Sequence, residues 1–286
     1  MVSCKMRMLA ALHRWWGIAF CLLIAMWFAS AIVMHFVPFP ARSKAGRIDG
    51  SDSGAGVRSA QDALRNAAEH ALSRGLDPSH AAVASIGYDQ WTVAGEFDPD
   101  RPLYRVAIND DAGTEIYVSS ASAEVVLLTT QTMRLANYFG SIAHWIYPTA
   151  LRHHARAWRA LMWWLSLLAT IGAGIGAIVG MIRLGTSTPY RGLQRVHHVF
   201  GLILSPFVLC WIFSGFLSMD DGLLSDLSAN PDGLFRALHT FDVPQLASHP
   251  RLRSILIVGL CLCGFAFSLT GVALAWRRLR GSHPAD

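Results

Sequence analysis

The sequence predicts a mostly α-helical membrane protein. Four transmembrane helices are expected to form two repeated helix pairs, with a small α+β module outside the cytoplasm between helices one and two. The first observation is composition: 53% of the 286 residues are hydrophobic and 15% are charged, which is typical of membrane proteins. The second is a set of four long apolar stretches separated by polar segments. The third is the recurrence of several residues at fixed offsets along the chain.

Four apolar stretches have the length needed to cross the hydrocarbon core of a bilayer, which takes about 20 residues. They cover approximately residues 12–37, 160–182, 196–219 and 255–276. The first stretch is expected to be a retained helix and not a cleaved signal peptide. Its apolar run is longer than about 15 residues, and the Pro38-Phe39-Pro40 segment that follows it is not a small-residue cleavage site.

The distribution of basic residues predicts the orientation of the helices, because Lys and Arg near the ends of spans favour the cytoplasm. Such residues precede the first span, join the second to the third and follow the fourth (Lys5, Arg7, Arg14; Arg183, Arg191, Arg195; Arg277, Arg278, Arg280). Both termini are therefore expected in the cytoplasm. A second basic cluster, on the side that this topology makes periplasmic, opposes the assignment (Arg152, Arg156, Arg159).

The expected organisation has five parts. They are residues 1–40 (cytoplasmic N-terminus and helix one), 41–140 (periplasmic module), 141–185 (periplasmic pre-helix and helix two), 186–220 (cytoplasmic loop and helix three) and 221–286 (periplasmic loop, helix four and cytoplasmic tail).

Residues 41–140 predict one helix followed by antiparallel strands. A Gly/Ser/Asp-rich linker covers residues 46–56, and apolar residues at helical spacing cover residues 60–72. The period then falls towards two, which predicts strands at 83–86, 91–94, 104–108, 116–118 and 123–128. Asp110-Asp111-Ala112-Gly113 is a hairpin turn signal.

Two groups of residues recur along the chain. At an offset of 184 residues (197 − 13), His13 matches His197, Trp27 matches Trp211 and Ser30 matches Ser214. At an offset of 95 residues (239 − 144), His144 matches His239 and His154 matches His249. Duplicated membrane segments commonly pack about a pseudo-two-fold axis. Duplicated histidines would then face one another in pairs, an arrangement that holds a haem from both sides.

The first histidine pair is the candidate ligand set of an inner haem. His13 and His197 both lie about one turn inside the cytoplasmic boundary of their spans. His198 is the rival of His197, because it points about 100° away on a helix and only one of the two can aim at a given cofactor.

The second pair, His144 and His239, is the candidate ligand set of an outer haem. Each precedes a span, and a surface helix before the span would carry it back to the membrane edge. Three further histidines on the same side remain alternatives: His35, His154 and His249.

Three motifs resemble the PepSY-associated transmembrane family. They are Leu12-His13-Arg14-Trp15-Trp16-Gly17 at the start of the first span, His144-Trp145-Ile146-Tyr147-Pro148 before the second, and the segment from Tyr117 to Val126. The last resembles a PepSY hairpin, with Ala123 where glycine is usual, so a looser turn is expected. The resemblance covers nearly the whole chain. Members of the family include inner-membrane siderophore reductases with two b-type haems.

The resemblance implies a haem b protein of the bacterial inner membrane, with two haems, that passes electrons across the membrane to ferric iron in the periplasm. The expected partners are membrane lipid, a ferric siderophore or other ferric chelate, and a cytoplasmic or quinol electron donor. No nucleic acid partner is expected, and no flavin or nicotinamide fingerprint is present in the sequence. Arg152, Arg156 and Arg251 would attract an anionic chelate, although a solvated interfacial face explains them as well.

Two other functions remain open at this point. The chain would serve as a haem-binding electron-transfer subunit for another enzyme. Alternatively, it would bind no haem and act as a regulatory or scaffold membrane protein through its PepSY-like module.

Overall fold

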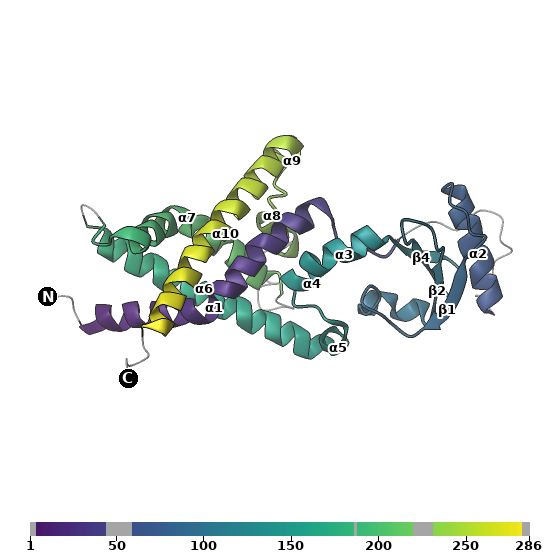
Figure 1. Cartoon of the computed structure of the whole chain (residues 1–286), viewed down its shortest axis with the longest axis horizontal. Helices are drawn as coiled ribbons and strands as arrows, with labels where there is room; N and C mark the ends of the chain where they lie inside the picture. The colour runs from purple at the N-terminus through teal and green to yellow at the C-terminus, as the bar shows by residue number, and fades with distance from the viewer. Residues whose placement is uncertain (1–3, 44–58, 186–187, 220–230, 282–286) are drawn as a thin grey trace. The chain divides into compact units, whose positions relative to one another are not determined.

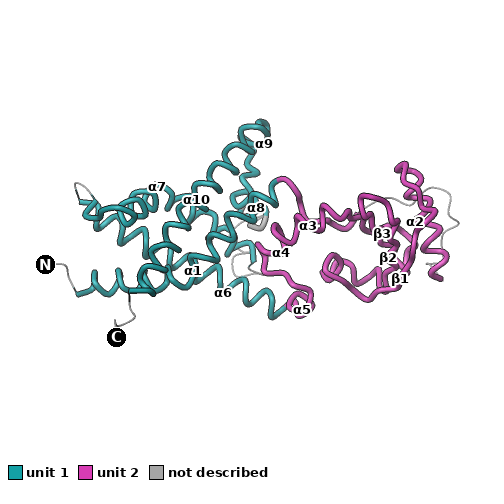
Figure 2. Tube along the Cα trace, viewed as in Figure 1, with its two compact units in different colours: residues 1–35, 156–286 teal, residues 36–155 magenta. Residues whose placement is uncertain are grey.

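A computed structural model describes residues 4–43, 59–185, 188–219 and 231–281. The chain divides into two compact units, which Figure 2 colours separately. Unit 1 comprises residues 1–35 and 156–286, and unit 2 comprises residues 36–155. The linker expected at 46–56 and the expected boundaries at 186 and 221 lie outside the described residues.

Unit 1 contains four long helices (Figure 1): α1 (Cys4–Phe36), α6 (Ala155–Leu184), α7 (Gly192–Leu217) and α10 (Pro250–Arg280). All four are long and apolar enough to cross a membrane, which confirms the prediction of a multi-pass membrane protein. Each helix begins several residues before the apolar stretch that predicted it. The 33 residues of α1 span about 50 Å at 1.5 Å per residue, more than the roughly 30 Å of a hydrocarbon core.

The interior of unit 1 is built from side chains of all four long helices. They are Phe28 of α1, Ala169 of α6, Leu204, Val208 and Ile212 of α7, and Ile257 and Cys261 of α10. Two shorter helices, α8 (Pro231–Thr240) and α9 (Pro244–Ala247), precede α10, and α8 packs against α7.

Unit 2 contains a four-stranded antiparallel sheet in the order β1-β2-β3-β4. Its strands are β1 (Ala82–Ile86), β2 (Leu103–Ala107), β3 (Glu115–Ser119) and β4 (Val125–Thr129). Its helices are α2 (Ala60–Ser73), the 3₁₀ helix η1 (Gly95–Asp100), α3 (Gln131–Phe139), α4 (Ser141–His144) and α5 (Thr149–Arg152). The small antiparallel sheet and the helix that precedes it are therefore as expected.

Helix α2 covers one face of the sheet (Figure 1). Ala63, Ala67 and Ala71 are fully buried at a spacing of four residues, and they pack on Val106 and Ile116 of the strands. Small side chains at this spacing let the helix lie close to the sheet. The opposite face is covered by a second cluster, formed by Trp91, Phe97, Leu103, Tyr117, Val126 and Leu127.

The prediction of a strand at 91–94 is wrong, because these residues form a turn that leads into η1. Asp89 is the physical reason. Its Oδ1 accepts hydrogen bonds from the backbone N–H groups of Trp91 and Thr92, at 3.0 and 3.1 Å. Local side-chain acceptors of this kind compete with strand pairing for the backbone donors.

The hairpin turns occur where the sequence places them. Gly113 closes the β2–β3 turn with φ +58°, and its N–H donates to the carbonyl of Asp110 at 2.9 Å. In the β3–β4 connection, Ala123 adopts φ +63°, the left-handed region that favours glycine. The alanine at this position therefore stores backbone strain.

Candidate functional site

The structure places His13 of α1 beside His197 of α7. Their imidazole centroids lie 6.4 Å apart, and the ring planes are inclined by 36°. Both side chains are partly buried. Two histidines that are 184 residues apart in the sequence (197 − 13) therefore meet inside the helix bundle of unit 1.

Glycines of two other helices face the two imidazoles. A Cβ atom on Gly176 of α6 would lie 2.5 Å from Cε1 of His13, and one on Gly271 of α10 would lie 3.6 Å from Cε1 of His197. The distance at Gly271 is an ordinary van der Waals contact, whereas the missing side chain of Gly176 makes room for the imidazole of His13. Gly172 receives Trp16 in the same way, and the indole N–H of Trp16 donates to the carbonyl of Leu168 at 2.7 Å.

The protonation of His197 follows from a chain of hydrogen bonds. Thr270 Oγ1 donates to the carbonyl of Phe267 at 2.6 Å, and a carbonyl oxygen can only accept. Since a hydroxyl has one proton, Thr270 Oγ1 must accept from Nδ1 of His197, at 2.8 Å. Nδ1 therefore carries a proton, and Nε2 of the neutral ring keeps its lone pair. Phe267 also stacks on the imidazole, with centroids 4.7 Å apart.

The imidazole of His13 has an unsatisfied nitrogen. Nδ1 is buried and makes no hydrogen bond of acceptable geometry to the part of the chain that the structure describes. The backbone of Gly172 also contacts this imidazole. A buried polar atom without a partner is costly unless a ligand or ion satisfies it.

His198, the rival of His197, uses both of its ring nitrogens. Nε2 donates to the carbonyl of Gly180 at 2.9 Å, and Nδ1 lies 2.7 Å from Thr188 Oγ1. The side chain is buried and packs edge-on against Tyr190. His198 therefore fastens the start of α7 to α6 and to the segment before α7, and it offers no free nitrogen to a metal.

His239 lies on α8 and points to the C-terminal part of α7. Its Nδ1 donates to the carbonyl of Trp211 at 2.9 Å and lies 3.3 Å from Ser214 Oγ. A Cβ on Gly215 would lie 3.0 Å from its Cε1. Burial lowers the pKa of His239 below its usual value, against a smaller opposing effect of the Trp211 carbonyl. The ring is thus neutral at pH 7, with its proton on Nδ1.

His144 is the last residue of α4 and belongs to unit 2, whereas His239 belongs to unit 1. Their pairing stays a prediction. Each histidine is followed two residues later by a residue with positive φ, Ile146 (φ 45°) and Phe241 (φ 53°). In each segment the backbone N–H of the residue after the positive-φ residue donates to the carbonyl five residues earlier. These hydrogen bonds join Tyr147 to Ile142 at 2.9 Å and Asp242 to Ala237 at 2.8 Å.

The three alternative outer histidines have different surroundings. Nε2 of His35 lies 2.9 Å from Ser254 Oγ, which joins the end of α1 to α10. His154 is exposed and packs edge-on against His153. His249 is the exposed N-cap of α10, with Nδ1 2.9 Å from Ser248 Oγ.

The three arginines expected at a substrate site divide between the units. Arg152 of unit 2 places its guanidinium 5.2 Å from the centroid of the Tyr147 ring. Arg156 at the start of α6 and Arg251 at the start of α10 are exposed residues of unit 1.

Two residues at this site were not anticipated from the sequence. Thr270 and Phe267, which contact His197, lie in the middle of an apolar span and have no match in the histidine repeats. The sequence signal that could have identified this contact was Thr270 itself, because a polar side chain inside a membrane span usually hydrogen-bonds to a neighbouring helix.

Comparisons of the chain with models of known families, with characterised proteins and with solved structures find no match. The fold and the site therefore define the class by themselves. The chain is a multi-pass membrane protein with a small antiparallel-sheet module and a partly buried pair of histidines between two of its apolar helices.

Proposed function

We propose that this chain is a haem b protein of the bacterial inner membrane, which moves electrons across the membrane to reduce ferric iron, bound to a siderophore, in the periplasm. The observation that carries the proposal is the approach of His13 and His197 from two apolar helices, with imidazole centroids 6.4 Å apart.

The residues around this pair fit a metal held between two imidazoles. A metal–imidazole bond is about 2 Å long, so two rings on opposite sides of one ion have centroids about 6 Å apart. His197 keeps the lone pair of Nε2, because Thr270 fixes the proton on Nδ1. His13 has a buried nitrogen without a partner among the described residues.

The size of the ligand set favours haem over a bare ion. Zinc in proteins takes four ligands, and among the described residues no three His, Cys, Asp or Glu side chains gather as such a site. Two histidines complete the coordination of a haem iron, whose other ligands come from the macrocycle. When bound, the haem would supply a one-electron iron couple with no open position for a substrate.

A second haem site at the other end of α7 is part of the proposal, with His239 as one ligand. The hydrogen bond from Nδ1 to the Trp211 carbonyl is a common way of presenting Nε2 to a metal. His197 and Ser214, which lies beside His239, are 17 residues apart on α7 (214 − 197), about 25 Å along the helix. Electrons would then cross most of the bilayer between the two sites.

The duplicated organisation into two helix pairs is also proposed. The segments around His144 and His239 share their backbone hydrogen bonds and positive-φ residues at the offset of 95. Ser30 and Ser214 are both buried, and each hydroxyl donates back to a carbonyl of its own helix, Ser30 to Met26 at 2.7 Å and Ser214 to Trp211 at 3.0 Å. Shared local structure at matching positions supports an origin by duplication.

The proposed reaction needs one electron for each ferric ion, which leaves as Fe²⁺. A quinol, which releases two electrons and two protons, would reduce two ferric ions; a cytoplasmic reductant is the other class of donor. The exposed Arg156 and Arg251 would attract an anionic ferric chelate by long-range electrostatics. Reduction weakens the chelate's hold, since Fe²⁺ carries less charge than Fe³⁺.

Reduction of a ferric chelate by the purified protein tests the proposal. The full chain is produced with haem supplied, reduced with dithionite and freed of excess reductant, and a ferric siderophore is then added. We expect a reduced-minus-oxidised spectrum of b-type haem that reverts as Fe²⁺ appears in a colorimetric assay. Haems that stay reduced beside the siderophore would instead indicate an electron-transfer subunit. A haem-supplied protein without a haem spectrum would leave only the scaffold function.

A further inference from the structure

Unit 2 carries a pocket that the proposed electron transfer does not use. It has a volume of about 320 Å³ and lies between the strands and α3. Arg105 of β2, Glu115 of β3 and Arg134 of α3 line its polar side, and Trp91, Leu135 and Tyr138 line its apolar side. The volume is at the lower end of ligand sites, which range from about 300 to 1,000 Å³.

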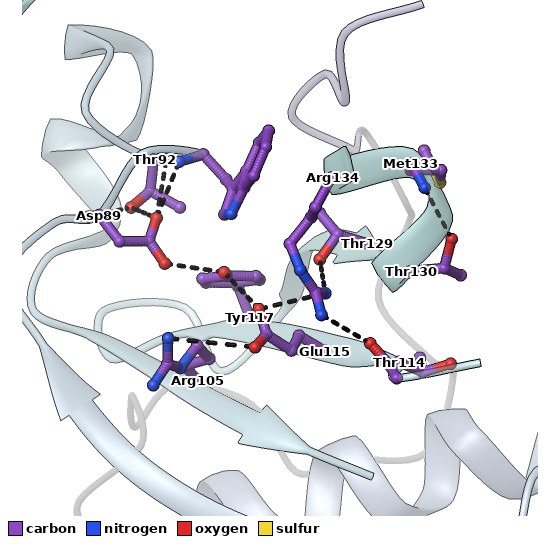
Figure 3. A network of polar contacts seen from close by, with 12 residues as sticks. Asp89, Thr92, Arg105, Thr114, Glu115, Tyr117, Thr129, Thr130, Met133 and Arg134 are labelled. Atoms are coloured by element: carbon purple, nitrogen blue, oxygen red, sulfur yellow. Dashed lines mark hydrogen bonds and ion pairs between the residues drawn. The ribbon is translucent and has the colours of Figure 1, made fainter. Parts of the chain in front are cut away.

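The polar side of the pocket has an excess of positive charge. Figure 3 shows the guanidinium groups of Arg105 and Arg134 reaching the single carboxylate of Glu115. The distances are 4.0 Å from Arg105 Nη1 to Oε1 and 3.3 Å from Arg134 Nη1 to Oε2. The charged residues that line the pocket are two cations and one anion, a sum of +1, which favours an anionic ligand. The nearby carboxylate of Asp89 is not part of the lining and bonds to the Tyr117 hydroxyl.

Glu115 is already engaged by groups other than Arg105. Its Oε2 lies 3.0 Å from the hydroxyl of Tyr117, which also lies 2.8 Å from Asp89 Oδ2. Arg134 is likewise held, since its guanidinium donates to Thr129 Oγ1 and to the carbonyl of Gly113, both at 2.9 Å. These bonds, drawn in part in Figure 3, fix the base of the pocket.

Arg105 is the cation with donors to spare. Its 4.0 Å contact with Glu115 is at the limit of an ion pair, and its side chain is 40% exposed. A guanidinium has five N–H donors in a planar fork that matches a carboxylate. Arg105 can therefore donate two hydrogen bonds to an anion that enters from the open side of the pocket. Glu115 meanwhile keeps its contacts with Arg134 and Tyr117.

The apolar side of the pocket is a surface of exposed side chains against which a flat apolar group could pack. Leu135 and Tyr138 of α3 are 54% and 50% exposed, and the Tyr138 ring meets the buried Trp91 edge-on at 5.5 Å. Gln131, Leu135 and Tyr138 follow a spacing of four and three residues, so they share one face of α3. Covering these side chains would remove apolar surface from water.

We propose that this pocket binds a small organic carboxylate with a flat, apolar body, of the class of aromatic monocarboxylates. The carboxylate lies on Arg105, and the body lies against Leu135 and Tyr138. The proposal rests on unit 2 alone, so it stands or falls independently of the haem.

Equilibrium dialysis of radiolabelled benzoate against the full chain in detergent tests the proposal, with detergent alone as the blank. We expect saturable binding of one benzoate per chain. Unlabelled acetate should compete more weakly, because it lacks the ring. Benzyl alcohol, which has the ring without the charge, should not compete. The absence of saturable binding, or competition by benzyl alcohol or benzylamine as strong as that by benzoate, overturns the proposal.

Three variants assign the binding to the pocket. Arg105→Gln should weaken benzoate at least about tenfold, the loss typical of one bidentate charged contact. Tyr138→Ala should weaken benzoate but leave acetate unchanged. Arg65→Gln removes the same charge from α2, where Arg65 pairs with Asp62 and lies outside the pocket, and should bind as the unaltered chain does. Equal benzoate affinity in Arg105→Gln and Arg65→Gln would refute the site.

Discussion

Thr270 Oγ1 accepts a hydrogen bond from His197 Nδ1 at 2.8 Å and donates one to the carbonyl of Phe267 at 2.6 Å. Two polar groups of apolar helices therefore satisfy one another and fix the tautomer of the histidine. The imidazole is held with the lone pair of Nε2 available, which is the form that ligates a metal. The link makes the candidate site depend on α10 as well as on α1 and α7.

Thr270→Val keeps the shape of the side chain and removes the acceptor for His197 Nδ1. We expect the haem at this site to bind 10- to 100-fold more weakly, roughly the effect of losing a partner that orients a metal-bound histidine. Titration of haem into the haem-free protein, followed optically, measures the change. Thr170→Val is the matched control, because Thr170 bonds to the carbonyl of Ser166 within α6; an equal loss of affinity in both variants would argue against the role of Thr270.

Gly176→Ala should displace the imidazole of His13. The added Cβ would lie 2.5 Å from Cε1 of the ring, closer than real Cβ contacts, and overpacking of this kind costs about 1–3 kcal/mol. We expect a lower haem content and a lower melting temperature of the purified protein. Gly174→Ala on the same helix, where nothing lies within 4 Å of the added atom, should change neither, and matching losses in both variants would contradict the role of Gly176.

His198→Ala should destabilise the protein without removing haem. The substitution deletes the bonds to Gly180 and Thr188, and a lost buried hydrogen-bonding group costs about 1–3 kcal/mol. Limited proteolysis between α6 and α7 should be faster, while the haem-to-protein ratio stays the same. Loss of haem in this variant, with retention in His197→Ala, would reverse the assignment of the two histidines.

Ala123→Gly should stabilise the β3–β4 hairpin. The left-handed conformation costs a non-glycine residue roughly 1–2 kcal/mol, and glycine avoids this cost. Glycine also loses more conformational entropy on folding, which offsets the gain by about 0.5–1 kcal/mol. A net gain of about 0.5–1 kcal/mol should slow hydrogen exchange in peptides covering residues 115–129. Ala121→Gly in the same turn, where φ is not positive, should speed exchange; slower exchange in both variants would show that strain at Ala123 is not the cause.

The sequence predicted the four apolar helices because a bilayer demands long, uncharged runs, and the lengths and compositions of α1, α6, α7 and α10 meet that demand. It predicted α2 from apolar residues at helical spacing, among them Ala63, Leu64 and Ala67. The strand expected at 91–94 failed because an alternating pattern does not reveal that Asp89 takes two backbone N–H groups. Helix α3 was missed as well, although Thr130 caps it by accepting from the N–H of Met133.

The site was predictable only in part. Fixed offsets in the sequence brought His13 and His197 forward as candidates, but the choice between His197 and His198 needed the contacts of Gly180 and Thr188. The sequence shows glycines in α6 and α10 but not what they contact, and only packing shows that Gly176 and Gly271 face imidazoles. The pocket at Arg105 left no sequence signal, because its residues come from separate strands and a helix.

Haem stoichiometry in His13→Ala and His197→Ala tests the central claim, a single haem held by this pair. The pyridine haemochrome content and the reduced-minus-oxidised spectrum are measured for each single variant and for the double variant, all purified after haem supplementation. We expect both single variants to lose the same spectral component and the double variant to lose no more. Full haem retention in either single variant, or loss of different components in the two, would contradict the pairing.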